Sequence, residues 1–170
     1  MKKLLIICNV PSYHQVEFFD EISKSSEIQL KVLYQLESTY DRHWKNQIAP
    51  KHDFIFLKRI YFSRARALYW NFNLAREICI FHPDKIVLTQ YANLNQLLIL
   101  WLSVFSRSKK IILWTELPGV RYSEAPVISN NFLRIIGRYF SLIPLKLNKA
   151  IQIWGIGHIA CTFYQSFVSR

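Results

Sequence analysis

The sequence is poor in glycine. Only four of its 170 residues are glycine, and none lies in the turn after the first apolar run, which reads NVPSYH at residues 9–14. Phosphate-binding loops and the dinucleotide-binding G-x-G-x-x-G motif need glycines at such a turn, because the backbone approaches the phosphates closely there. The chain therefore lacks the anchors of the usual ATP-, GTP- and NAD-binding domains.

Cysteines are few and their number is odd. Cys8, Cys79 and Cys161 lie far apart, so no Cys-x-x-Cys pair indicates a zinc site or a redox dithiol. Each has apolar neighbours, which predicts three buried free thiols, as in a reducing compartment. The histidines show no spacing typical of metal ligands, so we expect no metal site.

No apolar run is long enough to cross a bilayer. The longest, residues 97–105, is far below the ~20 residues that a spanning helix needs. The start, MKKLLIIC, is similar to a signal peptide, but its apolar part is short and no cleavage site follows. We interpret it as a buried first strand and expect a cytoplasmic protein, with any contact to the inner face of the cytoplasmic membrane being peripheral.

Acidic residues are scarce, and their distribution is one-sided. The chain has 22 Lys and Arg against 11 Asp and Glu, a net charge of +11. Residues 1–53 carry seven of each sign, whereas residues 54–170 carry 15 basic and four acidic residues, 15 − 4 = +11. This imbalance favours an anionic partner: nucleic acid, an anionic membrane surface or a phosphorylated ligand.

What the sequence does contain is a regular alternation of two apolar patterns. Branched apolar runs predict strands over residues 2–10, 28–36, 53–60, 85–90, 109–114 and 150–154. Helical spacing predicts helices over residues 15–25, 65–81, 94–105, 129–142 and 158–168. The alternation indicates an α/β fold: one Rossmann-like doubly wound parallel sheet of about six strands, with helices on both faces, spanning residues 1–170 as a single domain.

Ligands of such sheets bind beyond the carboxyl ends of the strands. This rule selects polar and aromatic side chains in the turns that follow four of the expected strands. They are Tyr13, His14, Arg42, Trp44, Gln90, Glu116 and Arg121. The neighbouring Asn9, Ser12 and Asn93 are better placed to cap helices, which is also the alternative for Gln90, while Tyr13 and His14 can serve the turn backbone alone.

Four segments together resemble a known family. They are NVPSYH at 9–14, RHW at 42–44, WTELPG at 114–119 and IWGIG-x-x-A-x-x-x-Y at 153–164. They look like the N-terminal domain of a family 4 glycosyltransferase of the GT-B fold, in the subgroup with a Pro-rich first loop. The likeness covers nearly the whole chain, although His14 stands where that subgroup more often has arginine.

The resemblance implies the acceptor-binding half of a hexosyltransferase. The nucleotide-sugar donor would bind a second, C-terminal domain that these residues lack, so we expect no cofactor in this chain and no activity from it alone. The acceptor would be a sugar or a polyprenyl-linked sugar in surface polysaccharide assembly. Whether the chain is a fragment or a subunit completed by a separately encoded domain stays open.

The resemblance also suggests roles for individual residues. Glu116 matches a position close to the reacting sugar, where a carboxylate can position hydroxyls or take the acceptor proton; a helix cap or an ion pair with Arg121 is the alternative. Arg42 and Trp44 suit a phosphate and a sugar face, although packing and a solvated charge explain them too.

Two basic segments also carry many aromatic residues, residues 57–70 and 132–149. Their cations, which we expect to contact an anionic membrane, are Lys58, Arg59, Arg64, Arg66, Arg134 and Arg138. A standalone basic module that docks on a membrane or on a partner subunit is therefore the alternative function, with nucleic acid less favoured. A helix packed on the sheet with a solvated basic edge explains the pattern equally, and Gly137 and Pro144 argue against one regular helix over 132–149.

Overall fold

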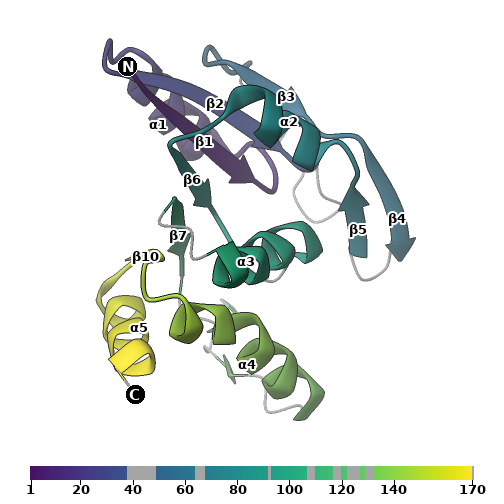
Figure 1. Cartoon of the computed structure of the whole chain (residues 1–170), viewed down its shortest axis with the longest axis vertical. Coiled ribbons are helices and arrows are strands. Elements are labelled where there is room, and N and C mark those ends of the chain that lie inside the picture. The colour runs from purple at the N-terminus through teal and green to yellow at the C-terminus, as the bar shows by residue number, and fades with distance from the viewer. Residues whose placement is uncertain are drawn as a thin grey trace. The chain divides into compact units, whose positions relative to one another are not determined.

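The computed structural model describes residues 1–37, 49–63, 68–91, 93–106, 110–116, 120–121, 127–128 and 132–169. The chain divides into two compact units, residues 1–89 and 90–170. Figure 1 labels their helices and strands. Each unit is described by itself below.

The first unit is built on four parallel strands. β1 (Lys2–Cys8) pairs on one side with β2 (Ile28–Tyr34) and on the other with β6 (Lys85–Leu88), and β2 pairs with β3 (Phe54–Phe56). Leu5, Ile6 and Ile7, whose side chains alternate between the two faces of β1, are each at most 2% exposed. Continuous apolar runs thus form strands buried on both faces, as predicted for a parallel sheet.

Helices α1 (Tyr13–Ser23) and α2 (Leu74–Phe81) cover opposite faces of this sheet (Figure 1). On β2, Lys31 faces α2, where its Nζ lies 3.4 Å from Glu77 Oε2. Tyr34, three residues on, points to the other face, because its hydroxyl meets His52, which contacts Asp20 of α1. The doubly wound pattern expected from the sequence is therefore present in this unit.

A two-stranded antiparallel hairpin occupies residues for which the sequence analysis predicted the start of a helix. β4 (Arg59–Ser63) pairs with β5 (Leu68–Asn71). The strand predicted over residues 53–60 is confirmed only for the short β3, and the prediction of a helix beginning at residue 65 is wrong there, since the helix begins only at Leu74. The reason is tertiary: the Tyr69 ring is buried against Tyr61 across the hairpin, and its hydroxyl is held by polar partners on the sheet.

The second unit pairs β7 (Ile111–Thr115) with β10 (Gln152–Gly155) in parallel. Helices α3 (Leu94–Ser106), α4 (Phe132–Leu147) and α5 (His158–Ser169) accompany these strands, and β8 (Val120–Arg121) pairs with β9 (Val127–Ile128) in antiparallel fashion. Across the described residues, six strands take part in parallel pairing, four in the first unit and two in the second. The predicted α/β, Rossmann-like class is confirmed.

Helix α4 differs from its prediction. It runs without a break from Phe132 to Leu147, although Gly137 and Pro144 argued against a regular helix there. Pro144 is buried, and its own carbonyl accepts the amide of Asn148 at 2.9 Å. Packing of Leu142 and Leu145, each only 1% exposed, therefore outweighs the loss of one helical hydrogen bond at the proline.

None of the three cysteines forms a disulfide, but they are not all buried. Cys8 is buried in β1 and Cys161 is partly buried, whereas Cys79 is exposed on α2. The prediction of three buried thiols is wrong for Cys79, because the buried side of this short helix is formed by Leu74 and Phe81 and Cys79 falls on the outer side.

Candidate functional site

The predicted ligand-binding residues divide between the two units. Tyr13 and His14, the first residues of α1, are exposed in the first unit. Gln90 and Glu116 belong to the second unit, where Glu116 is exposed directly after β7. Arg42, Trp44 and the side chain of Arg121 lie outside the described residues.

Glu116 is held in place through its backbone. The Tyr164 hydroxyl, on α5, donates a hydrogen bond to the Glu116 carbonyl oxygen at 3.2 Å. One residue earlier, the Thr115 carbonyl accepts the Ile156 amide at 2.8 Å. The two segments that carried the resemblance, around Glu116 and around Ile156, are therefore joined at the carboxyl ends of β7 and β10, with the Glu116 carboxylate left facing solvent.

Two glycines in the turn after β10 are required by geometry. A Cβ at Gly155 would lie 3.0 Å from the backbone nitrogen of Cys161 and 3.1 Å from its Sγ. Gly157 has φ +86°, in the left-handed region that other residues rarely adopt. These glycines let α5 begin close against the strand, which brings Tyr164 over the end of β7.

The Tyr164 hydroxyl acts as a donor and not as a base. Burial raises the pKa of Tyr164 far above its ordinary value of 10; nearby Tyr91 raises it further and a hydrogen bond with Thr115 opposes the rise only in part. The phenol therefore stays protonated at neutral pH. Tyr164 thus positions the Glu116 backbone as a neutral hydrogen-bond donor.

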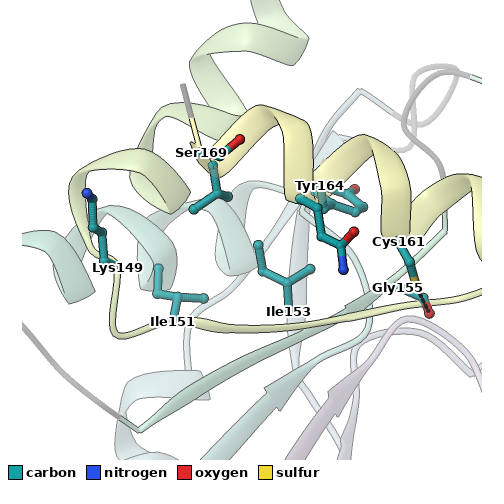
Figure 2. Close-up of a pocket in the computed structure, with 9 residues that line it drawn as sticks. Lys149, Ile151, Ile153, Gly155, Cys161, Tyr164 and Ser169 are labelled. Atoms are coloured by element: carbon teal, nitrogen blue, oxygen red, sulfur yellow. Dashed lines mark hydrogen bonds between the residues drawn. The ribbon is translucent and has the colours of Figure 1, made fainter.

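A pocket of about 440 Å³ lies between β10 and α5. Figure 2 shows Ile151 and Ile153 pointing from the strand segment toward the helix, with Lys149 at one end. Tyr164 contributes to its lining while its hydroxyl reaches Glu116. The pocket combines apolar walls with one cation, so it suits a ligand with an apolar body and an anionic group.

A second polar cluster lies at the carboxyl ends of β1 and β2, and the sequence analysis missed most of it. The Tyr69 hydroxyl lies 2.6 Å from Asn9 Oδ1 and 3.1 Å from Gln35 Oε1. Gln35 is fully buried, and its Nε2 has no hydrogen-bond partner among the described residues. Because a hydroxyl has one proton, turning the Gln35 amide by 180° would let it donate to Tyr69 and leave the oxygen unpaired instead.

The capping predictions have mixed outcomes. Asn93 caps α3, since its Oδ1 accepts the Asn95 amide at 2.9 Å. Asn9 does not cap α1, because its side chain is taken by Tyr69. Ser12 occupies the N-cap position of α1, but its hydroxyl donates to Gln15 Oε1 at 2.7 Å and makes no cap bond. Gln90 uses its backbone amide, which donates to Gln96 Oε1 at 3.0 Å.

A buried chain of three side chains fixes the entry to β3. His52 Nδ1 lies 2.6 Å from Asp20 Oδ1, and His52 Nε2 lies 3.2 Å from the Tyr34 hydroxyl. The same carboxylate oxygen accepts the amides of Lys51 and His52. Tyr34 has no exposed surface, and the three side chains together hold α1, β2 and the residues before β3 against one another.

The Asp20 carboxylate makes stability depend on pH. Burial alone raises its pKa, but the hydrogen bonds from His52 and from the Lys51 and His52 amides outweigh burial and lower the pKa below the ordinary 3.8. The unfolded chain therefore takes up this proton at higher pH than the folded chain. The stability that Asp20 contributes is present above about pH 4 and is lost as the pH falls through its folded pKa.

We expect urea denaturation at pH 7 and at pH 3 to show this loss, and Asp20→Asn to show a smaller difference between the two pH values. Glu21→Gln is the control, since the ion pair of Glu21 with Lys24 is exposed at the surface. If Asp20→Asn keeps the full pH difference of the unmodified chain, the carboxylate is not its source.

The membrane-contact candidates are described only in part. Lys58 is exposed, and the Arg59 guanidinium lies over the Tyr61 ring at 5.5 Å and donates to its hydroxyl at 3.0 Å. Arg64 and Arg66 lie outside the described residues. Arg134 and Arg138 belong to α4, but their side chains are not described. Within the described ranges, no helix is both long and apolar enough to cross a bilayer.

Metal-binding side chains do not gather in the described part of the chain: no three of its His, Cys, Asp or Glu residues stand close enough to share an ion. Comparison with protein-family profiles and with curated proteins found no match to this sequence.

Proposed function

We propose that this chain is the N-terminal, acceptor-binding domain of a GT-B glycosyltransferase that acts in surface glycan assembly. Two features support the proposal: the sequence resemblance and the Rossmann-like arrangement of parallel strands. The observation that carries it is the hydrogen bond from the Tyr164 hydroxyl to the Glu116 carbonyl. This bond joins two of the segments that make the resemblance and leaves the Glu116 carboxylate exposed at a strand end, where such folds bind ligands.

The acceptor would be a sugar hydroxyl, delivered on a polyprenyl diphosphate carrier. Glu116 would hydrogen-bond the acceptor hydroxyl and take its proton as that oxygen bonds to the donor sugar and the nucleoside diphosphate leaves. The apolar pocket beside Tyr164, with Lys149 at its end, supports a carrier that has both a hydrocarbon chain and an anionic group. The donor would bind a second domain, so catalysis by positioning requires both domains.

We expect this chain alone to bind a soluble short-prenyl diphosphate-linked sugar and to transfer no sugar to it from a nucleotide-sugar donor. Glu116→Gln should weaken that binding about tenfold, because a charged hydrogen bond to the sugar is lost. Isothermal titration calorimetry measures the binding, and a radiolabelled nucleotide sugar measures transfer.

The matched control is Glu27→Gln, which alters an exposed carboxylate just before the amino end of β2. Equal binding by the Glu116 and Glu27 variants, or sugar transfer by the unaided chain, contradicts the proposal.

A further inference from the structure

Helices α3 and α4 carry apolar side chains on the surface as well as in the core. On α3, Leu98, Leu102 and Phe105 are exposed, Phe105 by 80%, while Leu100 is buried. On α4 the exposed apolar residues are Ile136, Tyr139, Phe140, Ile143 and Leu147; apart from the adjacent pair 139 and 140, they follow one another at intervals of three or four. We call these eight residues the α3–α4 apolar face.

The two helices contact each other within the second unit, and their apolar stripes meet. The rings of Trp101 and Phe140 lie 5.0 Å apart between centroids. Trp101 falls on the same side of α3 as Leu98, Leu102 and Phe105, because these positions are three, four and seven residues apart. Asn148, just after α4, holds the helices together by donating to the Ser103 carbonyl at 2.9 Å. The face is thus one surface supported by a fixed helix pair.

An isolated apolar side chain on a surface is ordinary, but a stripe along each of two adjacent helices is not. On the second helix, the other side is already used for packing, since Leu142 and Leu145 are each 1% exposed. The exposed stripe is therefore additional to the core, and it needs an apolar partner of its own.

The charges around the face indicate which partner. Helix α3 has no charged residue, and every charged residue of α4 is basic. Residues 90–170 carry nine Lys and Arg against two acidic residues, 9 − 2 = +7. Lys146 lies 4.5 Å from the centre of the Phe167 ring, at the side of the face. A second copy of the chain would bring like charges together, so an anionic apolar surface is the better match.

We propose that the α3–α4 apolar face docks on an anionic lipid membrane and lies in the plane of its headgroup region. Apolar and aromatic side chains enter the interface while the cations around them meet the lipid phosphates. This inference does not depend on sugar transfer. It also differs from the expectation that basic residues of segments 57–70 and 132–149 make the contact, because it places the main energy of binding in uncharged residues of α3 and α4.

The test is co-sedimentation of the full chain with vesicles of phosphatidylcholine, with and without phosphatidylglycerol. We expect binding to the anionic vesicles, and a loss of about fivefold in the bound fraction for Leu102→Ser/Phe105→Ser. Ile80→Ser is the matched control, because Ile80 is an exposed apolar residue of α2 with nearly the same exposure as Leu102, 57% against 55%. Phe62→Ser tests the hairpin, where Phe62 is exposed.

Circular dichroism shows whether each variant is folded, and Tyr139→Ser on α4 provides a second, independent substitution in the same face. The proposal is overturned if the α3 double variant, folded, binds like the unmodified chain, or if only Phe62→Ser loses binding. It is also overturned if the unmodified chain does not bind vesicles and light scattering shows that it is a dimer, whereas the double variant is a monomer. Binding to a single-stranded oligonucleotide in place of vesicles would likewise overturn it.

Discussion

His52→Ala is expected to lower the free energy of unfolding by about 3 kcal/mol, from the cavity it opens and the hydroxyl it leaves unpaired. The His52 side chain has no exposed surface, and its ring packs edge-on against Phe19 with centroids 5.8 Å apart. Removing it also leaves the Tyr34 hydroxyl buried without its hydrogen bond and takes a donor from the Asp20 carboxylate. Urea denaturation at pH 7 measures the change.

A double-mutant cycle separates the hydrogen bond from the cavity. Tyr34→Phe removes the hydroxyl, so His52→Ala should be less damaging in that background than in the unmodified chain. His158→Ala is the control, because His158 is exposed at the start of α5. A change in unfolding free energy near zero for His52→Ala would show that His52 contributes little to stability. Strict additivity of His52→Ala with Tyr34→Phe would show that the hydrogen bond between the two residues contributes little.

Gly155→Ala is expected to lower the free energy of unfolding by about 1 to 3 kcal/mol, because the new methyl group has no room. Its Cβ would lie 3.0 Å from the Cys161 nitrogen and 3.2 Å from the Cys161 Cα, which are backbone atoms and cannot rotate away. Helix α5 must shift instead, and the bond from Tyr164 to Glu116 would lengthen. Thermal and urea denaturation measure the change.

Gly137→Ala is the matched control for this prediction. A Cβ at Gly137 meets nothing within 4 Å, and the residue lies inside α4. Alanine favours a helix by about 0.5 to 1 kcal/mol over glycine, so this variant should be more stable than the unmodified chain. Equal effects of the two substitutions would show that the contact with Cys161 is not limiting. In Gly155→Ala/Cys161→Ala only part of the loss should return, since the backbone atoms remain.

The parallel strands could be predicted from sequence because each is a short run of branched apolar residues, and burial on both faces demands such a run. The β4–β5 hairpin could not. Its sequence mixes basic, aromatic and aliphatic residues with no clear period, and its position depends on Tyr69 meeting Asn9 and Gln35, which are 60 and 34 residues away. No local pattern contains that information.

The same distinction applies to the candidate site. The position of Glu116 after a strand could be predicted, because the end of the apolar run before it is visible in the sequence. The structure places Glu116 at the end of that strand. Gln35 could have been predicted as a member of the polar cluster, since it is a polar residue directly after a buried apolar strand. Nothing in the sequence around its partner Tyr69 indicated such a role. The pocket beside β10 arises from the spacing between Ile151, Ile153 and a helix, which depends on how closely Gly155 lets the helix approach.

The bond between Tyr34 and His52 has a consequence for how this protein can change over evolution. The bond joins two residues that are 18 apart in sequence, on either side of residues 38–48, and so holds together the two ends of the segment between them. When the two ends of a segment are held together, doubling its length raises the entropic cost of closure by only about 0.6 kcal/mol. A longer connection between these two residues would therefore cost the sheet only a small amount of free energy.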